Sequence, residues 1–345
     1  MKPRIAVGAA LVVSLTACSP ARPASTATPA SAAPASTAPA STAPARAVSP
    51  GPAPAAPSPS RAAATPAASN SKLLVAVGDI ACDPSTAAFA HPSRSQCQMS
   101  ATERVAAGLH PDVVAVLGDT QYDRGASAAY ARSYNRSWGK LLPITRPAIG
   151  NHEYGTAGGA GYFRYFAGRG GTQGKGWYSY NLGAWHIVVL NSECAYAGGC
   201  GTRSPQVRWL TADLAAHPSA CTLAYWHEPR FSSGPHGSNA TFGPFWRALY
   251  KAHVDVVLNG HDHTYERFDR LNPDAHTDVH GAREFVVGTG GESLYSFRTV
   301  RAHSQVRNNT TFGVLALTLH AASYDWKFVP AAGGTFTDRG TTACH

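Results

Sequence analysis

The sequence contains no apolar run long enough to span a bilayer as a permanent helix. The nearest candidate, residues 5–15, follows Lys2 and Arg4 and has the length and flanks of the hydrophobic region of a secretory signal. We therefore expect an exported chain, and any membrane anchor must lie at this end.

The residues that close this run point to lipid attachment. They read Leu15-Thr16-Ala17-Cys18, which resembles the lipobox of bacterial lipoproteins. The resemblance implies a signal peptide over residues 1–17, cleavage before Cys18 and lipid on its thiol. The alternative is an ordinary cleavage site after Ala17, which would give a secreted protein.

Aromatic and acidic residues are absent from Ser19 to Asn70, a segment that holds 12 of the 25 prolines and repeats Ala-Ser-Thr-Ala-Pro units. A segment with so little to bury cannot offset its conformational entropy, so we expect it to be disordered. Proline bias keeps such a chain extended at roughly 3 Å per residue. Residues 18–70 are therefore predicted to form a lipid-anchored stalk, and residues 71–345 one large domain.

Excess charge is small once the segments before residue 71 are set aside. Five of the 29 lysines and arginines lie there, which leaves 24 basic and 20 acidic residues, a net charge of +4 instead of +9. No run of lysine and arginine with interleaved aromatics is present, so nucleic-acid binding is not indicated. A mild positive bias suits an anionic substrate, although many soluble domains share it.

Cysteine usage favours disulfides. Besides Cys18 there are six cysteines, and an even number is typical of disulfide-bonded exported proteins. Proximity favours Cys82–Cys97 and Cys194–Cys200, which leaves Cys221–Cys344 to tie down the C-terminus. A structural zinc site is the alternative, but no paired C-x-x-C motif supports it.

Five short apolar runs end directly at residue types that bind metal ions. The runs and the residues after them are 73–77 before Gly78-Asp79, 113–117 before Gly118-Asp119, 148–149 before Gly150-Asn151-His152-Glu153, 223–226 before His227, and 254–258 before Asn259-Gly260-His261-Asp262-His263. Apolar runs without alternation predict strands that are buried on both faces. Helices are predicted between them, at residues 100–109, 126–141, 204–216 and 242–252, the first with a capping box of Ser100 and Glu103.

This alternation of strands and helices predicts an α/β fold, in which ligands bind beyond the carboxyl ends of the strands. One such strand end could be coincidence, since a buried strand often stops at a Gly-Asp turn and a lone histidine is more often structural. Five such strand ends in one chain favour a metal site.

The motifs also occur in a known order over residues 73–265. They are Gly78-Asp79, Gly118-Asp119-Thr120-Gln121-Tyr122, Gly150-Asn151-His152-Glu153, Trp226-His227-Glu228-Pro229 and Gly260-His261-Asp262-His263. Together they resemble the calcineurin-like metallophosphoesterase superfamily, most closely its purple acid phosphatase branch. Many members have Asp-x-His at the first strand, whereas this chain has Ala81 there. Tyr122 stands where the purple branch supplies a phenolate, and its alternative is a tyrosine packed beneath the site.

The resemblance implies two metal ions bound by seven side chains. One ion, for which carboxylate and phenolate oxygens suit Fe³⁺, is bound by Asp79, Asp119, Tyr122 and His263. The other, a divalent Zn, Mn or Fe ion, is bound by Asp119, Asn151, His227 and His261, with Asp119 bridging the pair.

Two further histidines are expected near the substrate and not on metal. In the family, the histidine beside the asparagine ligand contacts the phosphate or the leaving group, which assigns His152 as the general acid. A second histidine, nine residues after the histidine of the fourth motif, lines the same pocket and corresponds to His236. The alternative for His236 is an ordinary exposed loop histidine. Glu153 and Asp262 are expected to support the ligands.

The implied function is the hydrolysis of phosphoesters, phosphomonoesters above all, by a hydroxide activated on the metal pair, with His152, helped by His236, protonating the leaving alkoxide. The implied partner is a small phosphoester. The alternatives are a phosphodiesterase or nucleotidase on the same metals, a surface binding lipoprotein that has lost turnover, and a lipoprotein that sequesters metal.

The implied fold is the metallo-dependent phosphatase type of α/β protein, a four-layer α/β/β/α sandwich with two facing mixed sheets. Beyond the last motif, residues 284–287 predict a strand, and residues 312–317 and 324–328 predict paired strands that would complete a second sheet. Plant-type purple phosphatases also carry an N-terminal β-domain, which the stalk cannot supply.

Overall fold

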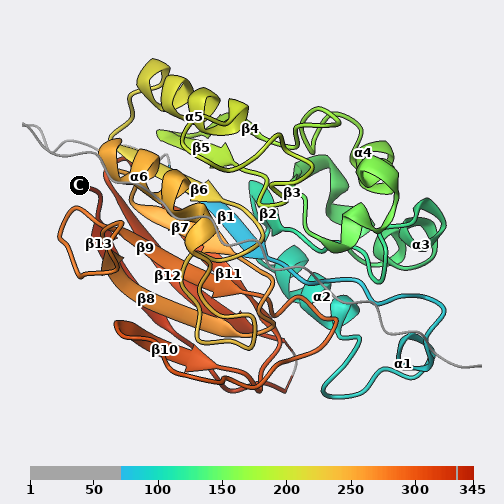
Figure 1. Cartoon of the computed structure of the whole chain (residues 1–345). Coiled ribbons are helices and arrows are strands. Elements are labelled where there is room, and N and C mark those ends of the chain that lie inside the picture. Colours follow the sequence, from blue (N-terminus) through green and yellow to red (C-terminus); the bar gives the residue numbers. More distant parts are fainter. Residues whose placement is uncertain (1–70, 332) are drawn as a thin grey trace, which may run out of the picture. The chain divides into compact units, whose positions relative to one another are not determined.

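The computed structural model describes residues 71–331 and 333–345 (Figure 1). The expected signal peptide over 1–17, the lipid-modified Cys18 and the stalk over 18–70 lie outside the described residues. In the described part of the chain, no helix has the length and hydrophobicity that a membrane span needs.

The described strands form two mixed sheets (Figure 1). The first sheet has the order β13 (Arg339–Ala343), β12 (Ser323–Pro330), β11 (Gly313–Leu319), β1 (Lys72–Val77), β2 (Val113–Leu117) and β3 (Thr145–Ala148). The second has the order β10 (Ser304–Asn308), β8 (Tyr265–Leu271), β9 (Ala282–Val287), β7 (Val256–Asn259), β6 (Cys221–Tyr225), β5 (Trp185–Val189) and β4 (Tyr178–Leu182). Each sheet contains a group of parallel strands, β1 to β3 at one edge of the first sheet and β5, β6, β7 and β9 in the middle of the second.

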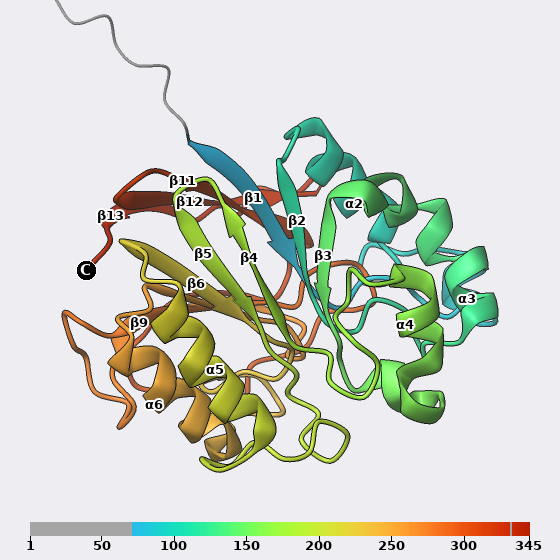
Figure 2. The ribbon, with the colours of Figure 1, turned by 90° about the horizontal axis from the view of Figure 1, so that it is seen from above.

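Helices lie against the outer faces of the sheets. The α-helices are α1 (Ala87–Ala90), α2 (Met99–Gly108), α3 (Ser127–Arg132), α4 (Ala160–Phe166), α5 (Pro205–Ala216) and α6 (Gly243–Lys251). Short 3₁₀ turns are η1 (Tyr134–Arg136), η2 (Trp138–Ile144), η3 (His152–Gly155), η4 (Ala157–Gly159) and η5 (Ala240–Phe242). Figure 2 shows α5 and α6 side by side on the second sheet, and α2 on the side of the first.

Alternate residues of β5 and its continuation face two different cores. Ile187 and Val189 belong to the core between the sheets, whereas Val188 and Leu190 pack with α5 through Leu210. Such alternation follows from the two-residue period of a strand. The layers therefore run helices, sheet, sheet, helices, and the predicted four-layer α/β/β/α sandwich is confirmed.

The prediction that residues 312–317 and 324–328 complete a second sheet is wrong. The hairpin of β11 and β12 forms, but β11 pairs with β1, so it extends the first sheet and does not complete the second. The second sheet is completed by β4, β5, β8 and β10, which the sequence did not reveal. Three of these strands carry many polar residues, as in the segments YSYNL, YERFDRL and SQVRN, so they lack the buried-strand pattern.

Two helix predictions also need correction. The helix expected over 126–141 breaks after Arg132, because the backbone N–H of Tyr134 bonds the side chain of Gln121 at 3.0 Å in place of a helical carbonyl. The capping box does not form either. Helix α2 begins at Met99, so Ser100 lies inside it and Gln98 takes the N-cap position.

The three predicted disulfides are all present, and their paired sulfurs exclude the alternative of a zinc site on these cysteines. They join Cys82 to Cys97, Cys194 to Cys200 and Cys221 to Cys344. Cys221 opens β6 and Cys344 directly follows β13, so the third disulfide connects the two sheets.

The disulfides should differ in their contribution to stability, because a longer closed loop restricts the unfolded chain more. Replacing Cys221 and Cys344, which are 123 residues apart, with alanine should lower the free energy of unfolding by about 5 kcal/mol. Replacing Cys194 and Cys200, only 6 residues apart, should lower it by about 2 kcal/mol. Guanidinium unfolding without reductant measures both, and equal losses would contradict the loop-length explanation.

Candidate metal centre

The seven predicted ligands converge where strands of both sheets end. Asp79 follows β1, Asp119 and Tyr122 follow β2, Asn151 follows β3, His227 follows β6, and His261 and His263 follow β7. The first three strands belong to one sheet and the other two to the second. The carboxyl ends of the two groups of parallel strands therefore meet at a single site.

One half of the site is built around the hydroxyl of Tyr122. It lies 3.0 Å from Oδ1 of Asp79, 3.2 Å from Oδ2 of Asp119 and 3.0 Å from Nε2 of His263. Burial, together with the charges of Asp119 and Asp79, raises the pKa of Tyr122 well above its usual value. A cation between these atoms would reverse that effect, because it favours the phenolate.

The other half is built around the fully buried ring of His227. Its Nδ1–H donates to the carbonyl of Leu117 at 2.9 Å, which directs the Nε2 lone pair into the site. Nε2 lies 3.1 Å from Oδ2 of Asp119, 3.1 Å from Oδ1 of Asn151 and 3.2 Å from Nδ1 of His261. Four electron-pair donors thus surround one point, which is the arrangement that a metal ion requires.

The pKa values of the two imidazoles in this second half are shifted in opposite directions. Burial opposes the charged form of His227, but the carboxylate of Asp119 outweighs it and raises the pKa of His227 well above its usual value. Burial and the neighbouring His227 lower the pKa of His261 to about 3. The carboxylate of Asp119 thus favours positive charge on its neighbour, as expected of a residue that binds cations.

Asp119 connects the two halves, because its Oδ2 lies within hydrogen-bond distance of both Tyr122 and His227. Together the site offers two carboxylates, a phenol, an amide and three imidazoles, a donor set that suits two metal ions. The ligand atoms of Asp119, His227 and His261 lie within 4.8 Å of one another. The residues therefore fit the predicted metal pair.

Glycines before the ligands allow the strand ends to approach one another. A Cβ atom on Gly118 would lie 2.5 Å from Nδ1 of His227, and one on Gly150 would lie 2.2 Å from Oδ1 of Asp119. Both distances are too short for any side chain. Gly118 and Gly150 are therefore packing requirements of the site.

Three of the predicted ligands have a strained backbone conformation. Asp79, Asp119 and His261 have φ values of 62°, 46° and 69°, in the left-handed region that non-glycine residues seldom adopt. Hydrogen bonds hold them there, since the N–H of His261 donates to Oδ2 of Asp79 at 2.9 Å and that of His152 to Oδ1 of Asp119 at 3.0 Å. Strain of this kind is typical of functional sites.

His152 lies beside the Tyr122 half. Its ring centroid is 4.3 Å from that of Tyr122, and its Nε2 is 3.8 Å from Oδ2 of Asp119. Its Nδ1–H donates to the carbonyl of Asp123 at 2.6 Å. Burial opposes the charged ring, but the Asp119 carboxylate outweighs it and raises the pKa of His152. The side chain is 29% exposed, so it can meet a ligand from solvent.

His236 lies beside the other half, with its ring 4.2 Å from that of His261. A hydrogen bond of 3.0 Å to Oδ1 of Asp262 fixes the ring and raises the pKa of His236. Asp262 is itself held by Ser232. His236 is thus an oriented side chain at the site, which the alternative of an ordinary loop histidine does not explain.

Glu153 supports the ligands from beneath. Its buried Oε1 accepts the N–H and hydroxyl of Thr120, each at 2.9 Å, and the N–H of Gln121 at 3.2 Å, while its Oε2 accepts the N–H of Gly150 at 2.9 Å. These bonds tie the segment after β2 to the segment after β3. Glu153 thereby fixes Asp119 relative to Asn151, the supporting role that the sequence predicted.

Two contacts of His263 were missed by the sequence analysis. The ring of Tyr295 stacks on His263 at 3.9 Å, and the hydroxyl of Ser293 lies 3.0 Å from its Nδ1. Both residues follow the turn Thr289-Gly290-Gly291. Only the two glycines of this turn could have indicated from the sequence that the backbone comes close to the site. The N–H of Gly290 bonds the carbonyl of Gly78 at 2.9 Å, which brings this segment to the site.

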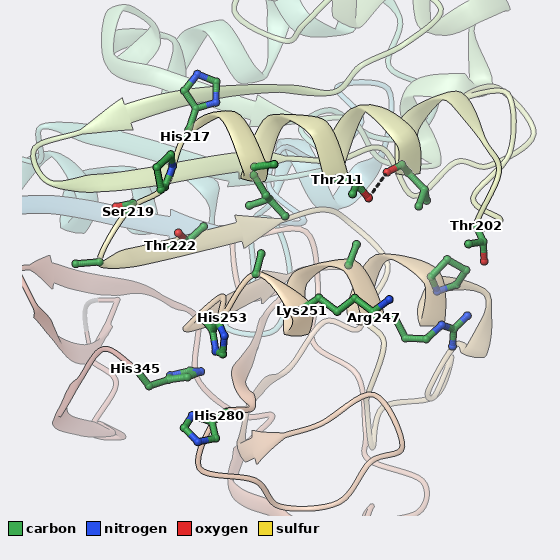
Figure 3. Close-up of a pocket in the computed structure, with 18 residues that line it drawn as sticks. Thr202, Thr211, His217, Ser219, Thr222, Arg247, Lys251, His253, His280 and His345 are labelled. Atoms are coloured by element: carbon green, nitrogen blue, oxygen red, sulfur yellow. Dashed lines mark hydrogen bonds between the residues drawn. The ribbon is translucent and has the colours of Figure 1, made fainter.

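A separate groove of about 860 Å³ lies between α5 and α6 (Figure 3). Its basic lining residues include Arg247, Lys251, His253, His280 and His345. None of the seven predicted ligands lines it, so the chemistry described above is confined to the strand ends.

The chain is similar to known phosphoesterases. The sequence model of the calcineurin-like phosphoesterase family matches residues 73–265, more than half of the chain and every predicted site residue. Purple acid phosphatase 15 of Arabidopsis thaliana is 27% identical over 218 residues, which cover 52% of this chain and 40% of that protein. Fe(3+)-Zn(2+) purple acid phosphatase 12 of the same plant is 30% identical over 135 residues, 34% and 28% of the two chains.

A solved structure shares the fold. Purple acid phosphatase PPD1 from yellow lupin (Lupinus luteus) seeds superposes with a TM-score of 0.64 at 19% identity, over 80% of this chain and 54% of that one. The matches to the two Arabidopsis proteins cover less than half of their length.

Proposed function

Because this chain belongs to the calcineurin-like phosphoesterase family and is similar to its purple acid phosphatases, we propose that it hydrolyses phosphoesters and prefers phosphomonoesters. The observation that carries the proposal is the convergence of seven donor side chains on two adjacent points that share Asp119. Two partly exposed histidines beside those points complete a site for an anionic substrate.

The proposed metals follow the donor atoms. Fe³⁺ suits the half with the Tyr122 oxygen and the Asp79 carboxylate, and a divalent Zn, Mn or Fe ion suits the half with Asn151, His227 and His261. The Fe(3+)-Zn(2+) name of one relative supports this division. When bound, such a pair lowers the pKa of water and stabilises negative charge on phosphoryl oxygens.

The chain's own residues position the substrate and carry a proton. His152, held through Nδ1 by the Asp123 carbonyl, has Nε2 free to donate a proton to the leaving oxygen. His236, fixed by Asp262, offers a charged donor to a phosphoryl oxygen from the opposite side. No residue of the chain needs to form a covalent intermediate.

We also propose that the protein acts outside the cytoplasm. Its three disulfides are typical of proteins in oxidising compartments. The signal over 1–17 and the lipobox ending at Cys18 then favour a surface lipoprotein, with secretion as the alternative.

The assignment of Tyr122 as an iron ligand predicts a coloured protein. Iron-loaded wild type should have a visible charge-transfer band from phenolate to Fe³⁺, and Tyr122→Phe should lose that band, because phenylalanine has no oxygen to donate. Absorption spectra at equal iron content measure this. Tyr295→Phe is the matched control, since Tyr295 stacks on His263 but is not an assigned ligand. If the iron-loaded wild type is colourless, Tyr122 is not an iron ligand.

A substrate panel tests the function itself. Purified protein loaded with Fe³⁺ and Zn²⁺ should hydrolyse phosphomonoesters with a higher kcat/KM than phosphodiesters. The reverse preference would identify a phosphodiesterase on the same centre. Metal binding without turnover of any phosphoester would overturn the enzymatic proposal in favour of a binding or sequestering protein.

A further inference from the structure

We propose that His186, Asp213 and His217 form a separate binding site for a divalent transition metal, with Zn²⁺ as the ion that fits best. The three side chains lie at the opposite end of the second sheet from the candidate metal centre. His186 pairs with Thr222 across β5 and β6, and Thr222 precedes His227 by five residues of extended chain, roughly 17 Å. The two sites therefore share no ligand.

The distances between the ligand atoms of this cluster are close to those around a single bound metal ion. Nε2 of His186 lies 2.9 Å from Oδ2 of Asp213, and Nδ1 of His217 lies 3.4 Å from Oδ1 of the same carboxylate. Two atoms bound to one zinc ion at about 2.1 Å are roughly 3.0–3.4 Å apart. One ligand atom from each of the three residues lies within 4.8 Å of the others, so a small closure completes the site.

Neighbouring polar groups orient the two buried ligands. Oδ1 of Asn181, directly opposite His186 on β4, lies 2.9 Å from Nδ1 of His186 and accepts a hydrogen bond from its N–H. Nε2 then presents a lone pair to a carboxylate oxygen, which is repulsive unless a proton or a cation lies between them. Ser179 donates its hydroxyl to Oδ1 of Asp213 at 2.8 Å. Such supporting hydrogen bonds are the usual companions of metal ligands.

The third ligand provides access from solvent. The side chains of His186 and Asp213 are 3% and 7% exposed, whereas that of His217 is 48% exposed. His217 follows the last residue of α5, and Figure 3 shows it apart from His253, His280 and His345. An ion can therefore arrive from solvent and keep a water molecule as its fourth ligand.

A structural ion pair between His186 and Asp213 would not need His217. The ring of His217 nevertheless stacks on that of His186 at 4.8 Å, with 16° between the planes. Its Nδ1 also donates to the carbonyl of Asp213 at 2.8 Å. If Nδ1 of His217 binds a metal ion, its hydrogen bond to the Asp213 carbonyl is replaced by the bond to the metal. A carbonyl at a helix end can accept a hydrogen bond from water instead.

Zinc content and thermal stability test the proposal on the full chain. We use the His227→Ala background, in which the main centre has lost a central ligand, so that the result does not depend on the proposed activity. After metal removal and dialysis against Zn²⁺, this protein should retain one more equivalent of zinc than its His217→Ala derivative. Zn²⁺ should raise its melting temperature, and His217→Ala should abolish that rise.

The matched control is His320→Ala. His320 also pairs with an aspartate, Asp325, at 2.9 Å and is 35% exposed, but this pair belongs to none of the three-residue clusters found among the described residues. His320→Ala should keep the full zinc content, and Asp213→Asn should lose the same equivalent as His217→Ala. In the otherwise wild-type chain, His217→Ala should leave phosphoester turnover unchanged. Equal zinc content in all variants, or an equal loss with His320→Ala, would overturn the proposal.

Discussion

Replacing Asp119 with asparagine should lower kcat for phosphoesters by on the order of 10⁴-fold or more, a loss of at least about 5 kcal/mol of transition-state stabilisation. Oδ2 of Asp119 is the atom that faces both Tyr122 and His227, and a neutral amide cannot balance two cations. The fold should survive, because asparagine has the same shape and its oxygen can still accept the N–H of His152. Steady-state kinetics, metal analysis and circular dichroism measure these effects.

The matched control for this variant is Asp112→Asn, at the other end of β2. Asp112 forms an exposed ion pair with Lys72 at 2.8 Å, a kind of contact that contributes little to stability. This substitution should leave turnover at the wild-type rate. Near wild-type turnover by Asp119→Asn, or by His227→Ala, would exclude the proposed centre.

His152→Ala should reduce turnover of alkyl phosphates by about 10²- to 10⁴-fold, the range expected for loss of a general acid. The loss should be much smaller with p-nitrophenyl phosphate, because its leaving group departs without a proton. The ratio of kcat values on the two substrates therefore measures proton donation separately from substrate binding.

His236→Ala provides the comparison, since that histidine is assigned to hold a phosphoryl oxygen. It should raise KM for both substrates to a similar extent and leave the ratio of their kcat values close to that of the wild type. An equal fall in kcat on both substrates for His152→Ala would instead show that His152 only positions its neighbours.

The main elements of the fold could be predicted because their signal is local. Buried strands such as β2 are continuous apolar runs, and burial on both faces requires that composition. Strands β4, β8 and β10 carry many polar residues, so their sequences are typical of loops. The end of α3 depends on Gln121, a residue outside the helix, so no pattern within residues 126–141 could reveal it.

The candidate site was predictable for a related reason. Each expected ligand follows a strand within a few residues, and the carboxyl ends of parallel strands meet at one edge. Tyr295 and Ser293 lie instead on a long connection after β9, where their contacts with His263 depend on the path of the whole segment. The same holds for His186 and Asp213, which are far apart in sequence and meet only through the packing of α5 on β5.

The position of β1 makes the site depend on the C-terminal part of the chain. β1 carries Asp79 at its end and lies between β2, its near neighbour in sequence, and β11, which begins only at Gly313. A protein shortened to residues 73–265 would keep all seven donors yet leave one side of β1 unpaired. Completion of the first sheet next to Asp79 therefore requires the C-terminal hairpin of β11 and β12, which is far from β1 in sequence.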